Sequence, residues 1–294
     1  MNKKWLLVIL LAMLALVLTG CGGEKATSAA FFEYIVTPDD TITIYAYTGN
    51  EMKVVIPSRI DGKKVTCIGF SDGSYGIMSS VLIPDGVTEI GEKAFKDCKT
   101  LTDIVIPNSV TYIGDQAFNG CENLVSITLP ESVTHFNPTF ANAKFESITL
   151  PKGTTGIGAF AFYKCTQLKE IVIPNGVKEI GQSAFSGCTN LTEVTISDGV
   201  TTILKGAFQN CSKLTRVELP DSVHTIGESA FRDCSSLEYI NIPFRAEVLV
   251  IGEKIDDYRI DVHSIFRGCS KVEVHVKKDS AAVEKLSHMN LVIE

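Results

Sequence analysis

The fold of this chain is decided by the stretch Cys165-Thr-Gln-Leu-Lys-Glu-Ile-Val-Ile-Pro174-Asn-Gly-Val-Lys-Glu-Ile-Gly181-Gln-Ser-Ala-Phe-Ser-Gly-Cys188. The same pattern returns with prolines at Pro84, Pro107, Pro130, Pro151, Pro174, Pro220 and Pro243, and with Ser197 where one more proline is expected. The step is 23 residues, except that two residues are missing between Pro130 and Pro151. Such a repeat predicts a solenoid, because one unit is too small to enclose its own apolar side chains.

Each unit is expected to contain a strand, a turn, a second strand and a helical turn. Residues 168–174 alternate between apolar and polar and end at a proline, which lacks an amide donor. Residues 177–180 read as the second strand, and Gly181 indicates positive φ or close backbone approach. Residues 182–186 are expected to form about one helical turn that places the Ala-Phe pair in the core. Stacking in register would give parallel ladders about 4.8 Å apart.

The pattern Leu-x-x-Ile-x-Ile-Pro-x-x-Val-x-x-Ile-Gly-x-x-Ala-Phe-x-x-Cys resembles the BspA-type leucine-rich repeat of bacterial and some protist surface proteins. The resemblance covers about residues 31 to 294. It implies a mainly β or α/β repeat solenoid, a leucine-rich repeat rod with parallel ladders and short helical turns. Ser109 and Gly176 stand where the commonest leucine-rich pattern has Asn or Cys, so a straighter rod than the horseshoes is expected.

Residues 1–20 have the features of an export signal. Lys3 and Lys4 precede an apolar run over 5–18 that is too short to span a bilayer comfortably. The ending Leu-Thr-Gly-Cys21 resembles the lipobox of bacterial lipoproteins, which implies lipid attachment at Cys21 and anchoring on the outer face of the cell membrane. The alternative is an ordinary signal peptide with an incidental cysteine.

The mature chain is expected to divide into four parts. Residues 21–30 are small and polar and predict a flexible tether. Residues 31–67 predict an N-terminal β cap with an irregular first coil, with a hairpin turn at 48–50. The solenoid follows over 68–278, with an acidic insertion near 245–256 and an expected bend at Asn137-Pro138. Residues 279–294 predict a C-terminal cap made of a helix and a strand.

The cysteines predict a structural column. Seven share one repeat position: Cys98, Cys121, Cys165, Cys188, Cys211, Cys234 and Cys269. Stacked equivalents would lie about 4.8 Å apart with parallel Cβ vectors, whereas a disulfide needs Cβ atoms that converge to about 3.8 Å. We therefore expect a ladder of buried thiols. No metal site is predicted, because the sequence has no Cys-x-x-Cys or Cys/His pairing, and no cofactor is predicted, because it has no phosphate loop or dinucleotide fingerprint.

The outward positions of the first strand are the candidate binding residues. They are Asp103, Val105, Ser126, Thr128, Ser147, Thr149, Glu170, Val172, Glu193, Thr195, Arg216, Glu218, Tyr239 and Asn241. A polar ladder of this kind suits an extended protein or polymer, although good strand propensity alone also explains its Thr and Val residues. The net charge of −7 becomes −9 once Lys3 and Lys4 leave with the signal, which argues against nucleic acid as partner.

Two non-catalytic functions follow from these features. The resemblance implies a cell-surface lipoprotein that binds a host extracellular protein or another envelope protein, as in adhesion. The alternative is a structural spacer or assembly scaffold in the bacterial envelope. An enzyme is disfavoured, since the repeat leaves few unique residues for a catalytic site: Gly181-Gln-Ser-Ala-Phe lacks the last glycine of a nucleophile elbow.

Overall fold

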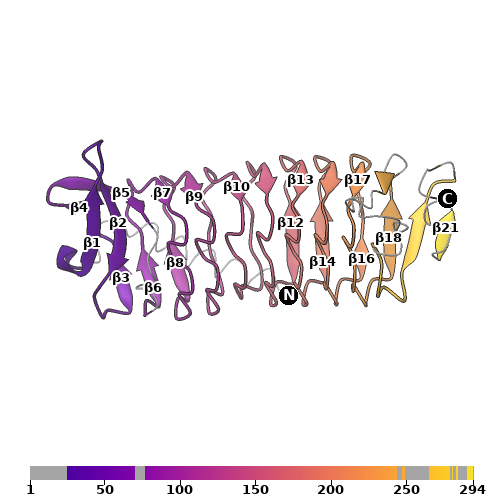
Figure 1. Cartoon of the computed structure of the whole chain (residues 1–294), viewed down its shortest axis with the longest axis horizontal. Coiled ribbons are helices and arrows are strands. Elements are labelled where there is room, and N and C mark those ends of the chain that lie inside the picture. Colours follow the sequence, from indigo (N-terminus) through magenta and orange to yellow (C-terminus); the bar gives the residue numbers. More distant parts are fainter. Residues whose placement is uncertain are drawn as a thin grey trace, which may run out of the picture.

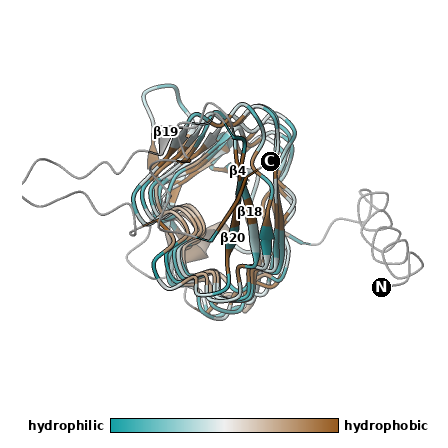
Figure 2. Ribbon diagram, turned by 90° about the vertical axis from the view of Figure 1, so that its right-hand side faces the viewer, coloured by the Kyte–Doolittle hydropathy of each residue, from teal (hydrophilic) through white to brown (hydrophobic). Residues whose placement is uncertain are grey.

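The computed structural model describes residues 25–69, 77–243, 247–248, 265–278, 280, 283 and 290–293. These residues form a long rod of about eight stacked coils (Figure 1), with the N-terminal strands at one end and β21 at the other. Seen along the rod, the coils superimpose around a common interior (Figure 2). The prediction of a repeat solenoid with parallel ladders is confirmed.

The N-terminal end is closed by a hairpin, as expected. One sheet contains β1 (Phe32–Val36), β2 (Ile42–Tyr47), β4 (Arg59–Ile60), β5 (Lys63–Ile68), β7 (Glu89–Ile90) and β9 (Tyr112–Ile113). Strands β1 and β2 are antiparallel, after the short 3-10 helix η1 (Ala29–Phe31), and β2 then pairs in parallel with β5. The hairpin turn lies at residues 37–41, where the Thr37 amide donates to the Thr41 carbonyl. The expectation of the turn at 48–50 was therefore wrong.

Two parallel strand ladders run along the rod. The first strands of the early coils are β3 (Lys53–Val55), β6 (Ser80–Leu82) and β8 (Asp103–Val105). Those of the later coils are β12 (Glu170–Ile173), β14 (Glu193–Ile196), β16 (Arg216–Val217), β18 (Tyr239–Ile242), β20 (Glu273–Val276) and β21 (Leu291–Ile293). We call the outward side of this ladder the strand face. The second ladder continues as β10 (His135–Phe136), β11 (Gly156–Ile157), β13 (Glu179–Ile180), β15 (Thr202–Ile203), β17 (Thr225–Ile226) and β19 (Glu247–Val248).

The segment expected to be a helical turn is instead a series of tight turns. In residues 182–188, the amides of Ala184 and Ser186 donate to carbonyls three residues earlier, whereas those of Ser183 and Phe185 donate to the next coil. Ser183 has φ 52°, a left-handed conformation that ends a right-handed helix. The Ala-Phe pair is nevertheless fully buried, as predicted.

A single file of phenylalanine rings fills the interior along the rod. Consecutive ring centroids lie 5.1 to 6.0 Å apart and the rings are nearly parallel; the file contains Phe95, Phe118, Phe140, Phe162, Phe185, Phe208, Phe231 and Phe266. Gly181 permits the close stacking of coils, since a Cβ there would lie 2.4 Å from the carbonyl carbon of Gly158. Of the two explanations predicted for Gly181, the structure therefore supports close backbone approach.

The shortened coil interrupts both ladders but not the core. In the second ladder, one sheet ends at β9 and the next begins at β10. In the first ladder, isolated parallel bridges link Val105 to Thr128 and Ser147 to Glu170. The Phe140 ring still stacks between its neighbours. Within the described residues, the Thr139 hydroxyl is the one buried side-chain oxygen or nitrogen that lacks a hydrogen-bond partner.

Several expectations fall outside the described residues. They are the signal and Cys21, most of the insertion near 245–256, and the C-terminal helix over 280–289 apart from single positions. The terminal strand β21 is present and pairs in parallel with β20. No helix in the described ranges has the length and apolarity required to cross a membrane.

Candidate binding face

The predicted binding residues all lie on the strand face. Their side chains point outward because alternate residues of a strand face opposite sides. Twelve of the fourteen are exposed, whereas Tyr239 and Asn241 are half-buried by neighbouring groups. The intervening residues, such as Ile171 and Val194, are buried in the core.

One row of these side chains crosses five coils in register. Glu170 lies opposite Glu193, Glu193 opposite Arg216, Arg216 opposite Tyr239, and Tyr239 opposite Glu273. Directly opposed like charges reduce the stability of a sheet, so the first pair is unfavourable in the free protein. Beside this row lie Val172, Thr195 and Asn241, the last of which pairs with His275.

Arg216, Tyr239 and His275 contact one another in sequence on this face, with the Tyr239 and His275 rings tilted by 42°. The Arg216 guanidinium carbon lies 3.7 Å from the Tyr239 ring centroid, and the rings of Tyr239 and His275 are 4.4 Å apart. Arg216 also donates two hydrogen bonds, of 3.0 and 2.6 Å, to Oε1 of Glu218. The bond to Glu218 raises the pKa of the Arg216 side chain, which therefore remains charged. Arg and Tyr are residue types that often anchor protein interfaces.

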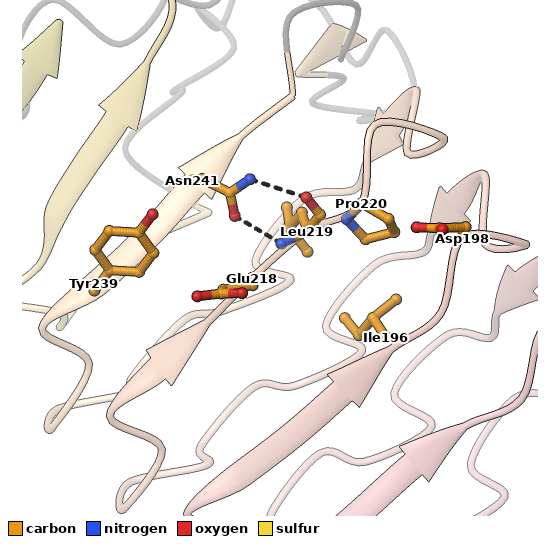
Figure 3. A pocket seen from close by; sticks show the side chains of 7 residues that line it. All are labelled: Ile196, Asp198, Glu218, Leu219, Pro220, Tyr239 and Asn241. Carbon is orange, nitrogen blue, oxygen red and sulfur yellow. Dashed lines mark hydrogen bonds between the residues drawn. The ribbon is translucent and has the colours of Figure 1, made fainter. Parts of the chain in front are cut away.

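A shallow, open hollow of about 360 Å³ lies beside this group (Figure 3). It occurs where the ladder between β14 and β18 is interrupted, since β16 has only two residues while its neighbours have four. The Asn241 amide takes the place of a strand partner there: Oδ1 accepts from the Leu219 amide at 2.7 Å, and Nδ2 donates to the Leu219 carbonyl at 2.9 Å.

The seven repeat-position cysteines are buried and have free thiols. Six donate a hydrogen bond of 3.0 to 3.3 Å to the carbonyl of the phenylalanine in the preceding coil: Cys121, Cys165, Cys188, Cys211, Cys234 and Cys269. Burial raises the pKa of Cys98 to about 12, with a further rise from Asp97. The half-buried Cys67 has a pKa of about 11, again mainly through burial. Such neutral thiols pack as apolar groups and are poor nucleophiles.

Sequence reasoning missed the grouping of Arg216, Tyr239 and Glu218 and the hollow beside it. The signal for the first was the 23-residue spacing between Arg216 and Tyr239, which places them side by side on adjacent coils. Among the described residues, no group of three or more His, Cys, Asp or Glu side chains is arranged to hold a metal ion.

The repeat array matches one protein-family model, described as the BspA type leucine rich repeat region, over residues 70–139 and 136–255. Among solved structures, a leucine-rich repeat protein of T. pallidum is 32% identical with a TM-score of 0.59. That match covers 65% of this chain and 91% of the other. A search of curated protein sequences finds no match.

Two further crystal structures are more distant. A leucine-rich repeat protein from Bacteroides ovatus is 21% identical with a TM-score of 0.45, covering 92% of this chain and 99% of the other. A leucine rich cell surface protein from Faecalibacterium prausnitzii is 25% identical with a TM-score of 0.39, covering 92% and 95%. Leucine-rich repeats generally form binding modules for other proteins and are generally not enzymes. The repeat, the stacked coils and the family match together place this chain in the BspA-type leucine-rich repeat family.

Proposed function

We propose that this protein is a lipid-anchored surface protein that binds another protein through its strand face. The observation that supports the proposal is the outward-facing row across five coils, in which Arg216 and Tyr239 are in contact among Glu170, Glu193 and Glu273. A rigid face of this kind offers many contacts with little loss of side-chain entropy on binding. The partner is a host extracellular protein or another envelope protein, and the activity is adhesion.

Export and anchoring rest on the sequence of the N-terminus. The basic start, the apolar run over 5–18 and the lipobox-like ending favour acylation at Cys21. A two-chain lipid would hold the rod stably on the outer membrane face. Labelling of the producing cells with a radioactive fatty acid tests this step: the wild-type chain should carry label, and Cys21→Ala should lose it.

The binding face is tested with two charge-reversal variants of the full chain. Glu193 lies on the strand face, and Glu179 lies at an exposed position of β13 on the second ladder. We expect Glu193→Arg to lose capture of partners from extracellular matrix proteins or from the producer's envelope, and Glu179→Arg to retain it. Equal behaviour of the two variants, with both folded by circular dichroism, would refute the strand face as the binding surface.

The second candidate function is a spacer or scaffold in the envelope, favoured by the rod shape of the stacked coils. Capture of envelope proteins that Glu193→Arg does not reduce, with no capture of matrix proteins, would support it.

A further inference from the structure

We propose that Phe160 and Tyr163, together with a polar pocket beside them, bind a neutral sugar ring of an oligosaccharide. We call these two residues the aromatic pair. They lie in the tight turns that follow β11, a part of the coil separate from the strand face. The inference therefore goes beyond the proposed protein binding and does not depend on it.

Phe160 stands at a position that is unfavourable for a bulky side chain. Its φ is 58°, in the left-handed region that such residues adopt only at a cost in free energy. Other coils have a polar residue or glycine at the same left-handed repeat position: Lys93, Gln116, Ser183, Gly206 and Ser229. Phe160 is 38% exposed, so core burial does not offset the cost. A strained aromatic residue on the surface is an indicator of a functional contact.

The geometry of the aromatic pair leaves a ring face open. The ring centroids of Phe160 and Tyr163 lie 5.6 Å apart with the rings nearly perpendicular, at 82°. This contact occupies at most one face of the Phe160 ring, and the ring meets no other ring or cation in the described part of the chain. The C–H groups of a sugar ring can pack on such a face as other apolar groups do.

A polar pocket of about 240 Å³ adjoins the aromatic pair. Lys164 lines this pocket, and its Nζ atom lies 5.2 Å from the Tyr163 ring centroid. Asn142 also lines it, and its backbone amide donates to the Tyr163 carbonyl at 2.7 Å. Drug-sized ligands occupy pockets of about 300–1,000 Å³, so this smaller volume suits a single ring.

The lining of the polar pocket offers hydrogen bonds without net charge. The side-chain amides of Asn119 and Asn142 make no hydrogen bond to any other described residue. An amide both donates and accepts, as a sugar hydroxyl does. The two lining carboxylates, Asp97 and Glu122, are balanced by two lining lysines, and Glu122 already lies 3.9 Å from Lys144. A neutral ligand rich in hydroxyl groups fits this lining better than an ion does.

Saturation-transfer NMR on the full chain, in a detergent that contains no sugar, tests the inference. The probes are maltotetraose, cellotetraose and the tetramer of N-acetylglucosamine, with hexaproline as a peptide that also packs on aromatic side chains. The test variants are Phe160→Ser and Asn142→Gly. Both should fold, because Ser183 and Gly187 occupy the same left-handed positions in the next coil, and circular dichroism checks this. The matched control is Tyr112→Ala, which removes an aromatic ring that is 53% exposed on the second ladder.

We expect saturation transfer to at least one of the three sugars. Phe160→Ser should weaken that binding about tenfold, the upper range for one aromatic contact, and Asn142→Gly about threefold through loss of a hydrogen bond. Tyr112→Ala should change it less than about twofold, and Glu193→Arg should leave it unchanged.

Four results would overturn the inference. They are absence of transfer to all three sugars, transfer to hexaproline alone, unchanged binding in both test variants, and equal losses in Phe160→Ser and Tyr112→Ala. Loss of the protein partner in Glu193→Arg with sugar binding intact would support both sites separately. Loss of sugar binding in Glu193→Arg would place the sugar on the strand face and contradict the assignment to the aromatic pair.

Discussion

Replacing Thr139 should stabilise the rod. This side chain is fully buried in the shortened coil, and its hydroxyl has no hydrogen-bond partner among the described residues. A buried polar group left unpaired costs about 1–3 kcal/mol. Thr139→Val removes that group and keeps the volume, so we expect a gain of about 1–3 kcal/mol in the free energy of unfolding. Thr139→Ala should gain less, because each buried methyl group lost costs about 0.8 kcal/mol.

Thr154 provides the matched control for this prediction. It is equally buried, but its hydroxyl donates to the Pro151 carbonyl at 2.7 Å. Thr154→Val should therefore lose about 1 kcal/mol, the net value of an ordinary hydrogen bond. Urea unfolding followed by circular dichroism measures both variants. Equal destabilisation of the rod by Thr139→Val and Thr154→Val would refute this prediction.

Three further predictions concern the core. Phe185→Ala should cost about 3–5 kcal/mol in urea unfolding, because the ring stacks between two others at 5.1 and 5.3 Å; a loss below about 1 kcal/mol would contradict the column. Gly181→Ala should destabilise by roughly 1–3 kcal/mol through backbone overlap, whereas Gly153→Ala, whose nearest contact is 3.6 Å, should be nearly neutral in the same assay. The raised pKa of Cys98 means that the folded state favours the neutral thiol. The stabilisation that this thiol gives to the folded state is therefore complete below about pH 9. It declines as the pH rises toward 12, by up to about 1.4 kcal/mol in the free energy of unfolding per pH unit. Cys98→Ala should make stability fall less steeply with pH above 9, and an unchanged slope would count against this contribution.

The repeat predicted the coils because its signals are local and redundant. The proline step set the register, and the alternation at Ile171 and Ile173 identified the buried side of each strand, which the structure confirms. The prediction of a helical turn was wrong because residues such as Ser183 and Lys164 adopt the left-handed conformation, and nothing in their side chains indicates a positive φ. The hairpin turn was misplaced because Thr48-Gly49-Asn50 has turn composition while residues 37–41 also do.

The candidate site was only partly predictable. The outward positions follow from strand alternation, and the contact between Arg216 and Tyr239 could have been read from their 23-residue spacing. The hollow could not be predicted from the sequence, because it depends on β16 ending after two residues and on the Asn241 side chain replacing a backbone partner. Neither feature has a signature in the repeat.

Photocrosslinking from two equally exposed strand positions tests the central claim most directly. Val172 on the strand face is 58% exposed and Tyr112 on the second ladder is 53% exposed. With benzoylphenylalanine at either position of the full chain, we expect a covalent adduct with a partner protein from position 172 and none from position 112. Adducts from position 112 alone, or from both positions equally, would contradict it.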